Sequence, residues 1–229
     1  MPSGSRLQYL DALGIDTWLP RTPQVIPASA APAPAADASA DWQLLQDEVS
    51  GCVKCGLAAT RTRTVFGVGN PHAEWLVIGE APGAEEDRQG KPFVGAAGKL
   101  LDAMLQAIGL SREQNVFVAN MLKCRPPGNR DPQPAEVAAC LPYLMRQIAA
   151  IKPKLILAVG RIAAQNLLAT DVPLGRLRGR VHRFGPLSTA LIVTYHPAYL
   201  LRSPAEKRKA WEDLKFARDY FKNTFVPGS

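Results

Sequence analysis

The chain has 229 residues, of which 47% are hydrophobic and 21% charged, and this composition excludes wholesale disorder, a collagen-like chain and a coiled coil. Its apolar runs, such as those at 155–159 and 191–193, are far shorter than the roughly 20 residues of a membrane-spanning helix. Residues 1–40 hold two basic and three acidic residues, so residues 41–229 carry a net charge of +8 against +7 for the whole chain. This excess of positive charge suits a partner made of phosphates, and ordinary solubility charge is the alternative.

The first 40 residues divide into two segments. Residues 1–19 lack the basic region, apolar run and cleavage site of a secretory signal, so we expect a cytoplasmic protein. They instead hold a small cluster of apolar side chains, typical of a short peptide motif or helix. Residues 20–40 contain five prolines and eight alanines, and this composition predicts a flexible linker.

The body, residues 41–229, alternates strand-like and helical patterns. Apolar runs predict four strands, at 75–79, 116–119, 155–159 and 191–193. Helical patterns lie between and after them, at 100–108, 134–151 and 161–168, and a last helix is expected to start from a capping box at 203–206. The alternation predicts an α/β fold, a three-layer α/β/α sandwich around a central, mainly parallel four-stranded sheet.

Polar residues follow the predicted strands at their carboxyl ends, where α/β sheets collect their chemistry. These segments are 79–83, 120–124, 160–161 and 194–202. The loop after the first strand, continuing through 92–98, is rich in glycine and proline, which fix tight turns that a ligand can approach closely. The chain has neither a GxxxxGK[ST] nor a GxGxxG motif, so nucleotide chemistry is not indicated.

The chain has four cysteines, Cys52, Cys55, Cys124 and Cys140. In a reducing compartment they are better interpreted as metal or cluster ligands than as disulfides. The second pair lacks the close spacing of a zinc knuckle, whereas an iron–sulfur cluster takes four thiolates from separated loops. A [4Fe-4S] cluster is therefore predicted, and four unrelated buried thiols are the alternative.

A basic stretch at 174–183 carries Arg176, Arg178, Arg180 and Arg183. The spacing of two between the first three suggests one face of a strand or hairpin. Contact with DNA phosphates is the functional interpretation, and a solvated edge guarded by charge is the alternative.

Taken together, these residues resemble the family 4 uracil-DNA glycosylases, the iron–sulfur branch of the uracil-DNA glycosylase superfamily. The resemblance runs from about residue 51 to 220 and rests on the four cysteines together with GEAPG (79–83), PFVG (92–95), NMLKCRP (120–126) and HPAYLLR (196–202) in the family's order. It implies a DNA repair enzyme that flips uracil out of DNA and hydrolyses its N-glycosidic bond, releasing free uracil and leaving an abasic site.

The resemblance also implies roles for single residues. Phe93 would stack on the flipped base, and His196 would hydrogen-bond uracil O2 as negative charge builds on the departing base. Asn120 offers the donor and the acceptor that match O4 and N3–H of uracil. Glu80 lines the uracil pocket with Gly79 and Ala81 and is the third catalytic candidate. Pro82, Gly83 and Arg202 are assigned to DNA, together with Arg176 and Arg178 of the basic stretch. Leu200 is placed to act as an apolar wedge in the duplex, and a core position is the alternative for a leucine in this loop.

One position departs from the best-known members of the superfamily. They have an aspartate two residues after the strand-end glycine to position the attacking water, and here Ala81 takes that place. A glycosylase that traps itself covalently on DNA is one alternative, but its histidine-bearing basic insertion has no counterpart in the short segment 125–132. A non-catalytic iron–sulfur or zinc module that binds nucleic acid is the other.

The N-terminal segment carries a second resemblance. Residues 7–21 look like the short N-terminal peptide of the psi subunit of bacterial DNA polymerase III, which docks on the chi subunit. The segment Leu7–Trp18 has too few apolar side chains for a core, and a peptide that folds back on its own body or a chance match are the alternatives. We expect a monomer that acts on single- or double-stranded uracil-containing DNA, with a replisome contact through residues 1–25.

Overall fold

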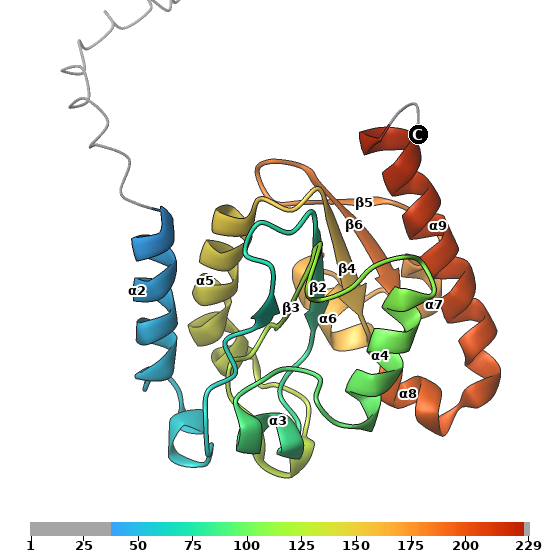
Figure 1. Ribbon diagram of the computed structural model, residues 1–229. Helices are drawn as coiled ribbons and strands as arrows, with labels where there is room; N and C mark the ends of the chain where they lie inside the picture. Colours follow the sequence, from blue (N-terminus) through green and yellow to red (C-terminus); the bar gives the residue numbers. More distant parts are fainter. Residues whose placement is uncertain (1–37, 227–229) are drawn as a thin grey trace, which may run out of the picture. The chain divides into compact units, whose positions relative to one another are not determined.

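The computed structural model describes residues 38–226 of the chain (Figure 1). The predicted peptide motif at 1–19 and the predicted linker as far as residue 37 lie outside the described residues. Among the described residues, the first helix is α2, which spans Ala38–Ser50 and so includes the last three residues assigned to the linker. Trp42 of this helix packs edge-on against the rings of Phe66 and Phe117, at centroid distances of 5.1 and 5.4 Å.

A six-stranded sheet lies at the centre of this body, in the order β1-β3-β2-β4-β6-β5. Its four inner strands are parallel and confirm the predicted sheet: β2 (Trp75–Gly79), β3 (Val116–Asn120), β4 (Leu155–Val159) and β6 (Thr189–Thr194). Two antiparallel edge strands were not predicted, namely β1 (Val68–Gly69) and β5 (His182–Phe184). With only two and three residues, neither carries a recognisable alternation.

Helices cover both faces of the sheet, as expected for three layers (Figure 1). One face packs against α2, α5 (Pro134–Ile151), α6 (Arg161–Leu167) and α7 (Leu174–Leu177). The other packs against α4 (Ala96–Gln106), α8 (Pro197–Arg202) and α9 (Lys207–Phe225). The short α3 (Ala84–Gln89) and the 3-10 turns η1 (Gly56–Ala59), η2 (Pro127–Asn129) and η3 (Pro204–Glu206) complete the body.

One expectation about a helix start needs correction. The side chain of Ser203 makes no capping hydrogen bond. Its main-chain carbonyl accepts from Glu206 N at 3.0 Å in a 3-10 turn, and α9 begins only at Lys207. A capping box forms instead at the start of α5, where Gln133 N donates to Glu136 Oε2 at 2.8 Å.

Within residues 38–226, no helix combines the length and apolar character needed to cross a bilayer.

Candidate active site

A cavity of about 390 Å³ opens at the carboxyl ends of β2, β3 and β6. It brings together most of the residues that the sequence analysis assigned to substrate and DNA: Glu80, Ala81, Pro82, Gly83, Phe93, Asn120, His196 and Arg202. Parallel strands deliver these segments to the same edge of the sheet, although they are far apart in sequence.

Asn120 is the last residue of β3 and pairs in register with Gly79 of β2. Its side chain is 2% exposed, and Oδ1 has no hydrogen-bond partner among the described residues. A Cβ at Gly79 would lie 2.4 Å from this oxygen and 2.6 Å from Cζ of Phe93, so only glycine leaves room for both. Because an unpaired buried polar atom is costly, the amide is poised for a polar ligand in the cavity.

Phe93 adopts a left-handed backbone, with φ of 52°, which is unusual for an aromatic residue. Arg112 stabilises this turn by donating to the carbonyls of Pro92 and Phe93 at 2.9 and 3.0 Å. A Cβ at Gly98 would lie 1.8 Å from the Phe93 carbonyl oxygen, so α4 approaches the turn closely. The ring is thereby held 5.6 Å from the ring of His196, at an interplanar angle of 30°.

Glu86 also lines the cavity, although the sequence analysis did not select it. Its Oε1 accepts hydrogen bonds from the amides of Val94 and Gly95 at 2.9 and 3.1 Å. The carboxylate therefore ties α3 to the turn that carries Phe93. It also opposes, by charge attraction, the lowering of the His196 pKa.

His196 precedes α8, where its Nδ1 accepts a hydrogen bond from the amide of Ala198 at 3.1 Å. Burial, assisted by the positive charge of Arg202, lowers the pKa of His196 to about 4. The imidazole is therefore neutral at pH 7. Since Nδ1 is an acceptor, the proton lies on Nε2, which makes this atom a donor.

Glu80 follows β2 and is partly buried in the cavity wall. Burial, together with the negative charge of Asp131, raises its pKa to about 7, and the positive charge of Arg161 opposes the rise. Asp131 is itself paired with Arg161 through a contact of 2.9 Å. The sequence analysis did not select Asp131, which reaches the cavity from the segment after η2.

A buried polar network lies behind His196. Thr194, the last residue of β6, donates to Asp213 of α9 at 2.8 Å. Arg178 pairs with the same carboxylate through contacts of 2.7 and 3.0 Å and lies over the ring of Tyr195 at 4.5 Å. The network therefore fixes the end of β6 immediately before the histidine.

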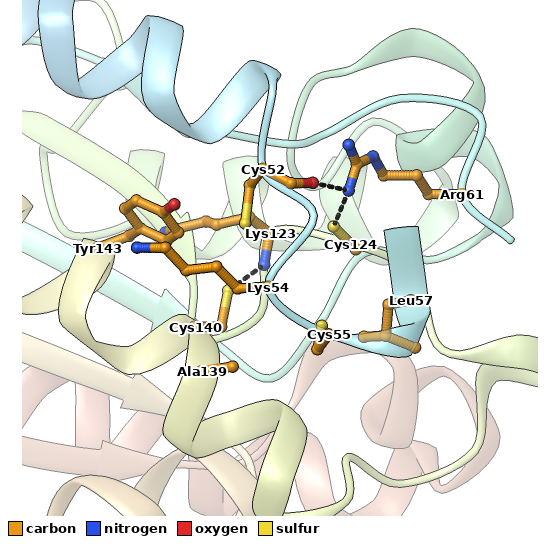
Figure 2. Close-up of a pocket in the computed structure, with 10 residues that line it drawn as sticks. All are labelled: Cys52, Lys54, Cys55, Leu57, Arg61, Lys123, Cys124, Ala139, Cys140 and Tyr143. Carbon is orange, nitrogen blue, oxygen red and sulfur yellow. Dashed lines mark hydrogen bonds between the residues drawn. The ribbon is translucent and has the colours of Figure 1, made fainter. Parts of the chain in front are cut away.

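The four cysteines converge on a second pocket, shown in Figure 2. Cys52 and Cys55 lie between α2 and η1, Cys124 follows β3, and Cys140 is on α5. No set of three or more histidine, cysteine or acidic residues between 38 and 226 is arranged to hold a metal ion. Four thiols around one pocket nevertheless match the donor set of an iron–sulfur cluster, which is wider than a single ion.

Polar contacts to the cysteine sulfurs are consistent with this interpretation (Figure 2). Arg61 donates to Cys124 Sγ at 3.4 Å and to the Cys52 carbonyl at 2.6 Å, and the Lys123 amide donates to Cys140 Sγ at 3.2 Å. Burial raises the pKa of Cys140 to about 11 and also raises the pKa of Cys124. Thiolates here would therefore need a bound metal or cluster to remain deprotonated.

Comparison with known proteins decides the family. The sequence profile of the uracil DNA glycosylase superfamily matches residues 66–215. The type-4 uracil-DNA glycosylase of Archaeoglobus fulgidus is 48% identical over 175 residues, which cover 73% of this chain and 87% of that protein. Those of Saccharolobus solfataricus and Thermotoga maritima are 44% and 39% identical, covering 77% and 79% of this chain and 84% and 94% of theirs.

This chain belongs to the type-4 uracil-DNA glycosylases. The resemblance stated from its motifs is confirmed, as is the predicted α/β fold. Membership of this family implies an iron–sulfur cluster, and the pocket lined by the four cysteines offers suitable ligands.

Two residues assigned to DNA in this type-4 uracil-DNA glycosylase, Leu200 and Arg178, require correction. Leu200 is 1% exposed and packs in the core with α4 and α9, because α8 turns it inward, so it is not an available wedge. Arg178 is held by Asp213 and Tyr195 and so is not free for phosphates. Arg176 is exposed, but it lies on α7, so the arginines of 174–183 do not share one strand face.

Proposed function

We propose that the protein flips uracil out of DNA and hydrolyses its N-glycosidic bond, releasing free uracil and leaving an abasic site. The observation that carries the proposal is the buried Asn120 amide, which lines one cavity with Phe93 and His196 and whose Oδ1 has no hydrogen-bond partner within residues 38–226. The names of the curated relatives, type-4 uracil-DNA glycosylases, support the same reaction.

Recognition of the base follows from the amide chemistry. Asn120 Oδ1 accepts from N3–H of uracil and its Nδ2 donates to O4. Cytosine presents an amino donor at position 4 and an unprotonated N3, so both contacts become mismatches. Phe93, held in its strained turn, provides the face on which the flipped base stacks.

His196 acts on the leaving group. As the bond between N1 of uracil and C1′ of the sugar breaks, its electron pair moves onto the base and negative charge reaches O2. The neutral imidazole donates a hydrogen bond from Nε2 to this oxygen, in an orientation fixed beforehand by Ala198. The uracil anion then leaves without first being protonated.

Glu80 acts on the water. With Ala81 in the place of an aspartate, Glu80 is the carboxylate that immediately follows β2 in the cavity wall. In its ionised form it orients a water toward C1′ and accepts a proton as the new C–O bond forms. Asp131 and Arg161 set the charge around it.

Cys52, Cys55, Cys124 and Cys140 would hold a [4Fe-4S] cluster, which supplies a structural clip between segments far apart in sequence. On the DNA side, Arg202 and the Pro82–Gly83 turn line the cavity, and Arg176 adds exposed positive charge. The partner is uracil-containing DNA, single- or double-stranded.

Two further proposals concern the whole protein. It acts as a cytoplasmic monomer, and residues 1–25 bind a replisome component. A synthetic 1–25 peptide with no affinity for the chi subunit would overturn the second proposal, whereas binding that Trp18→Ala abolishes would support it.

Single-turnover assays with excess enzyme test the reaction. Oligonucleotides carrying uracil, thymine, hypoxanthine or xanthine are compared, and release of free uracil with little release of thymine is expected. Asn120→Ala should lower the rate by about 10²–10³-fold, the effect of losing one preorganised polar contact, while DNA affinity changes little. A covalent DNA adduct on a denaturing gel would favour the trapping alternative, and binding without release the non-catalytic module.

A further inference from the structure

Lys123 is the largest charged side chain in the core, at 1% exposure, and it lies between the cavity and the cysteine pocket. Its ammonium donates to the main-chain carbonyl of Asn120 at 2.7 Å and to Oε1 of Gln147 at 2.6 Å. Its own main-chain amide donates to Cys140 Sγ at 3.2 Å, as Figure 2 shows. One residue thus contacts both the base-reading segment and a cysteine of the second pocket.

Gln147 belongs to the same arrangement. It is fully buried on α5, two helical turns after Cys140, so both side chains are presented on one face of the helix. Its Nε2 donates to the carbonyl of Phe66 at 3.0 Å. The Lys123–Gln147 pair therefore ties α5 to two main-chain carbonyls, those of Phe66 and Asn120.

These two carbonyls lie where the sheet loses a strand. β1 pairs with β3 at Val68↔Val118 and Gly69↔Phe117, and the same register would place Phe66 opposite Asn120. The ladder stops before that point, so these carbonyls are taken up by side chains instead of strand neighbours. The end of β3, which presents the Asn120 amide, thus depends on Lys123 at its edge.

Space filling alone does not account for a lysine here. A methionine of similar length would fill the volume without the cost of burying a charge. The two oxygens that accept from the ammonium, those of the Asn120 carbonyl and the Gln147 amide, are neutral. The ammonium additionally fixes the positions of the Asn120 carbonyl and the Gln147 side chain, through two short charge-assisted hydrogen bonds.

We propose that Lys123, supported by Gln147, is a positioning residue that fixes the Asn120 amide for uracil. This inference rests on the proposed function. It extends that function from the residues that touch the base to a buried pair that does not. It also assigns α5, which presents Cys140 on the same face as Gln147, a part in holding the base-reading strand end.

Lys123→Met tests the inference, with Lys154→Met as the matched control at a surface ion pair with Glu74. Lys123→Met should lower the single-turnover rate constant by about 10- to 100-fold and weaken the binding of free uracil, while affinity for uracil-free DNA stays within about twofold. With saturating enzyme, the rate constant does not depend on the folded fraction, so a merely structural role would not produce this pattern. Lys154→Met should leave all three quantities unchanged.

Gln147 provides a second arm should Lys123→Met fail to fold. Gln147→Glu loses the hydrogen bond to the Phe66 carbonyl but keeps an acceptor for the ammonium, and it should stay within about threefold of the native rate. Gln147→Leu removes both contacts and should lose about tenfold. If the native protein releases no uracil, the proposed function is wrong. If it does and Lys123→Met, or Gln147→Leu in its place, keeps the native rate and uracil affinity, only the positioning role is overturned.

Discussion

The amide of Ala198 donates to Nδ1 of His196 at 3.1 Å, and this contact sets the tautomer of the imidazole before any substrate binds. The ring lines the cavity with Nε2 as its donor atom, and burial of the ring keeps it neutral. A neutral donor strengthens its hydrogen bond as charge grows on the leaving base, and no proton has to move.

His196→Ala should lower the single-turnover rate by about 10²–10³-fold, with His72→Ala, on a surface loop, as the control. Because the pKa of His196 is lowered to about 4, the imidazole does not titrate between pH 5.5 and 8. Nitrogen NMR of the labelled protein should show the His196 ring neutral and protonated at Nε2 throughout this range. A His196 signal that titrates near pH 6.5 would contradict this account.

Glu80 should govern the pH dependence instead. Its pKa is raised to about 7, so the ionised fraction increases from about pH 6 to pH 8, and the single-turnover rate should rise over this range and then level off. Glu80→Gln should be slow, with a flat profile. A native profile that is equally steep in Glu80→Gln would assign the titration to another group.

Stability should move the opposite way at Glu80. A carboxyl whose pKa is raised on folding binds more protons in the folded state, so its contribution to stability falls as pH rises from about 4.5 through about 7. The melting temperature of Glu80→Gln should therefore rise relative to that of the native protein between pH 5 and pH 8. An unchanged difference across this range would mean that Glu80 is not buried as a costly carboxylate.

The cysteine pocket makes a compositional prediction. Anaerobically purified protein should contain about four irons and four sulfides per chain and absorb broadly near 400 nm. Cys140→Ser should lower the melting temperature but leave the single-turnover rate of the folded fraction nearly unchanged. The serine hydroxyl can still accept the hydrogen bond that the Lys123 amide donates to Cys140 Sγ in the native protein. Stoichiometric zinc without iron would contradict the cluster.

Sequence reasoning succeeded where one segment carries its own signal. The runs at 75–79 and 155–159 are buried strands because continuous apolar residues ending at a glycine suit a parallel sheet covered on both faces. The residues at the strand ends then reach one cavity as a consequence of that topology.

It failed where the outcome depends on a distant partner. Arg178 looks free in its basic stretch, and only the fold brings Asp213, 35 residues away, against it. Glu86 and Asp131 enter the cavity from segments whose approach no local pattern encodes. Lys123 reads as a surface lysine between apolar neighbours until Gln147 is placed beside it.

Helix α8 provides the last prediction, because two adjacent leucines in it have opposite environments. Leu200 is 1% exposed, whereas Leu201 and Tyr199 are 43% and 38% exposed. Leu200→Ala should therefore destabilise the protein by about 2–5 kcal/mol through a core cavity, with its single-turnover rate nearly intact.

Tyr199, which lines the active-site cavity and is exposed, is the better candidate for contact with an opened duplex. Tyr199→Ala should slow release from double-stranded DNA more than from single strands and leave the melting temperature nearly unchanged. Equal slowing on both substrates would remove Tyr199 from duplex opening, and a Leu200→Ala protein of native stability with a defect confined to duplex DNA would restore the wedge to Leu200.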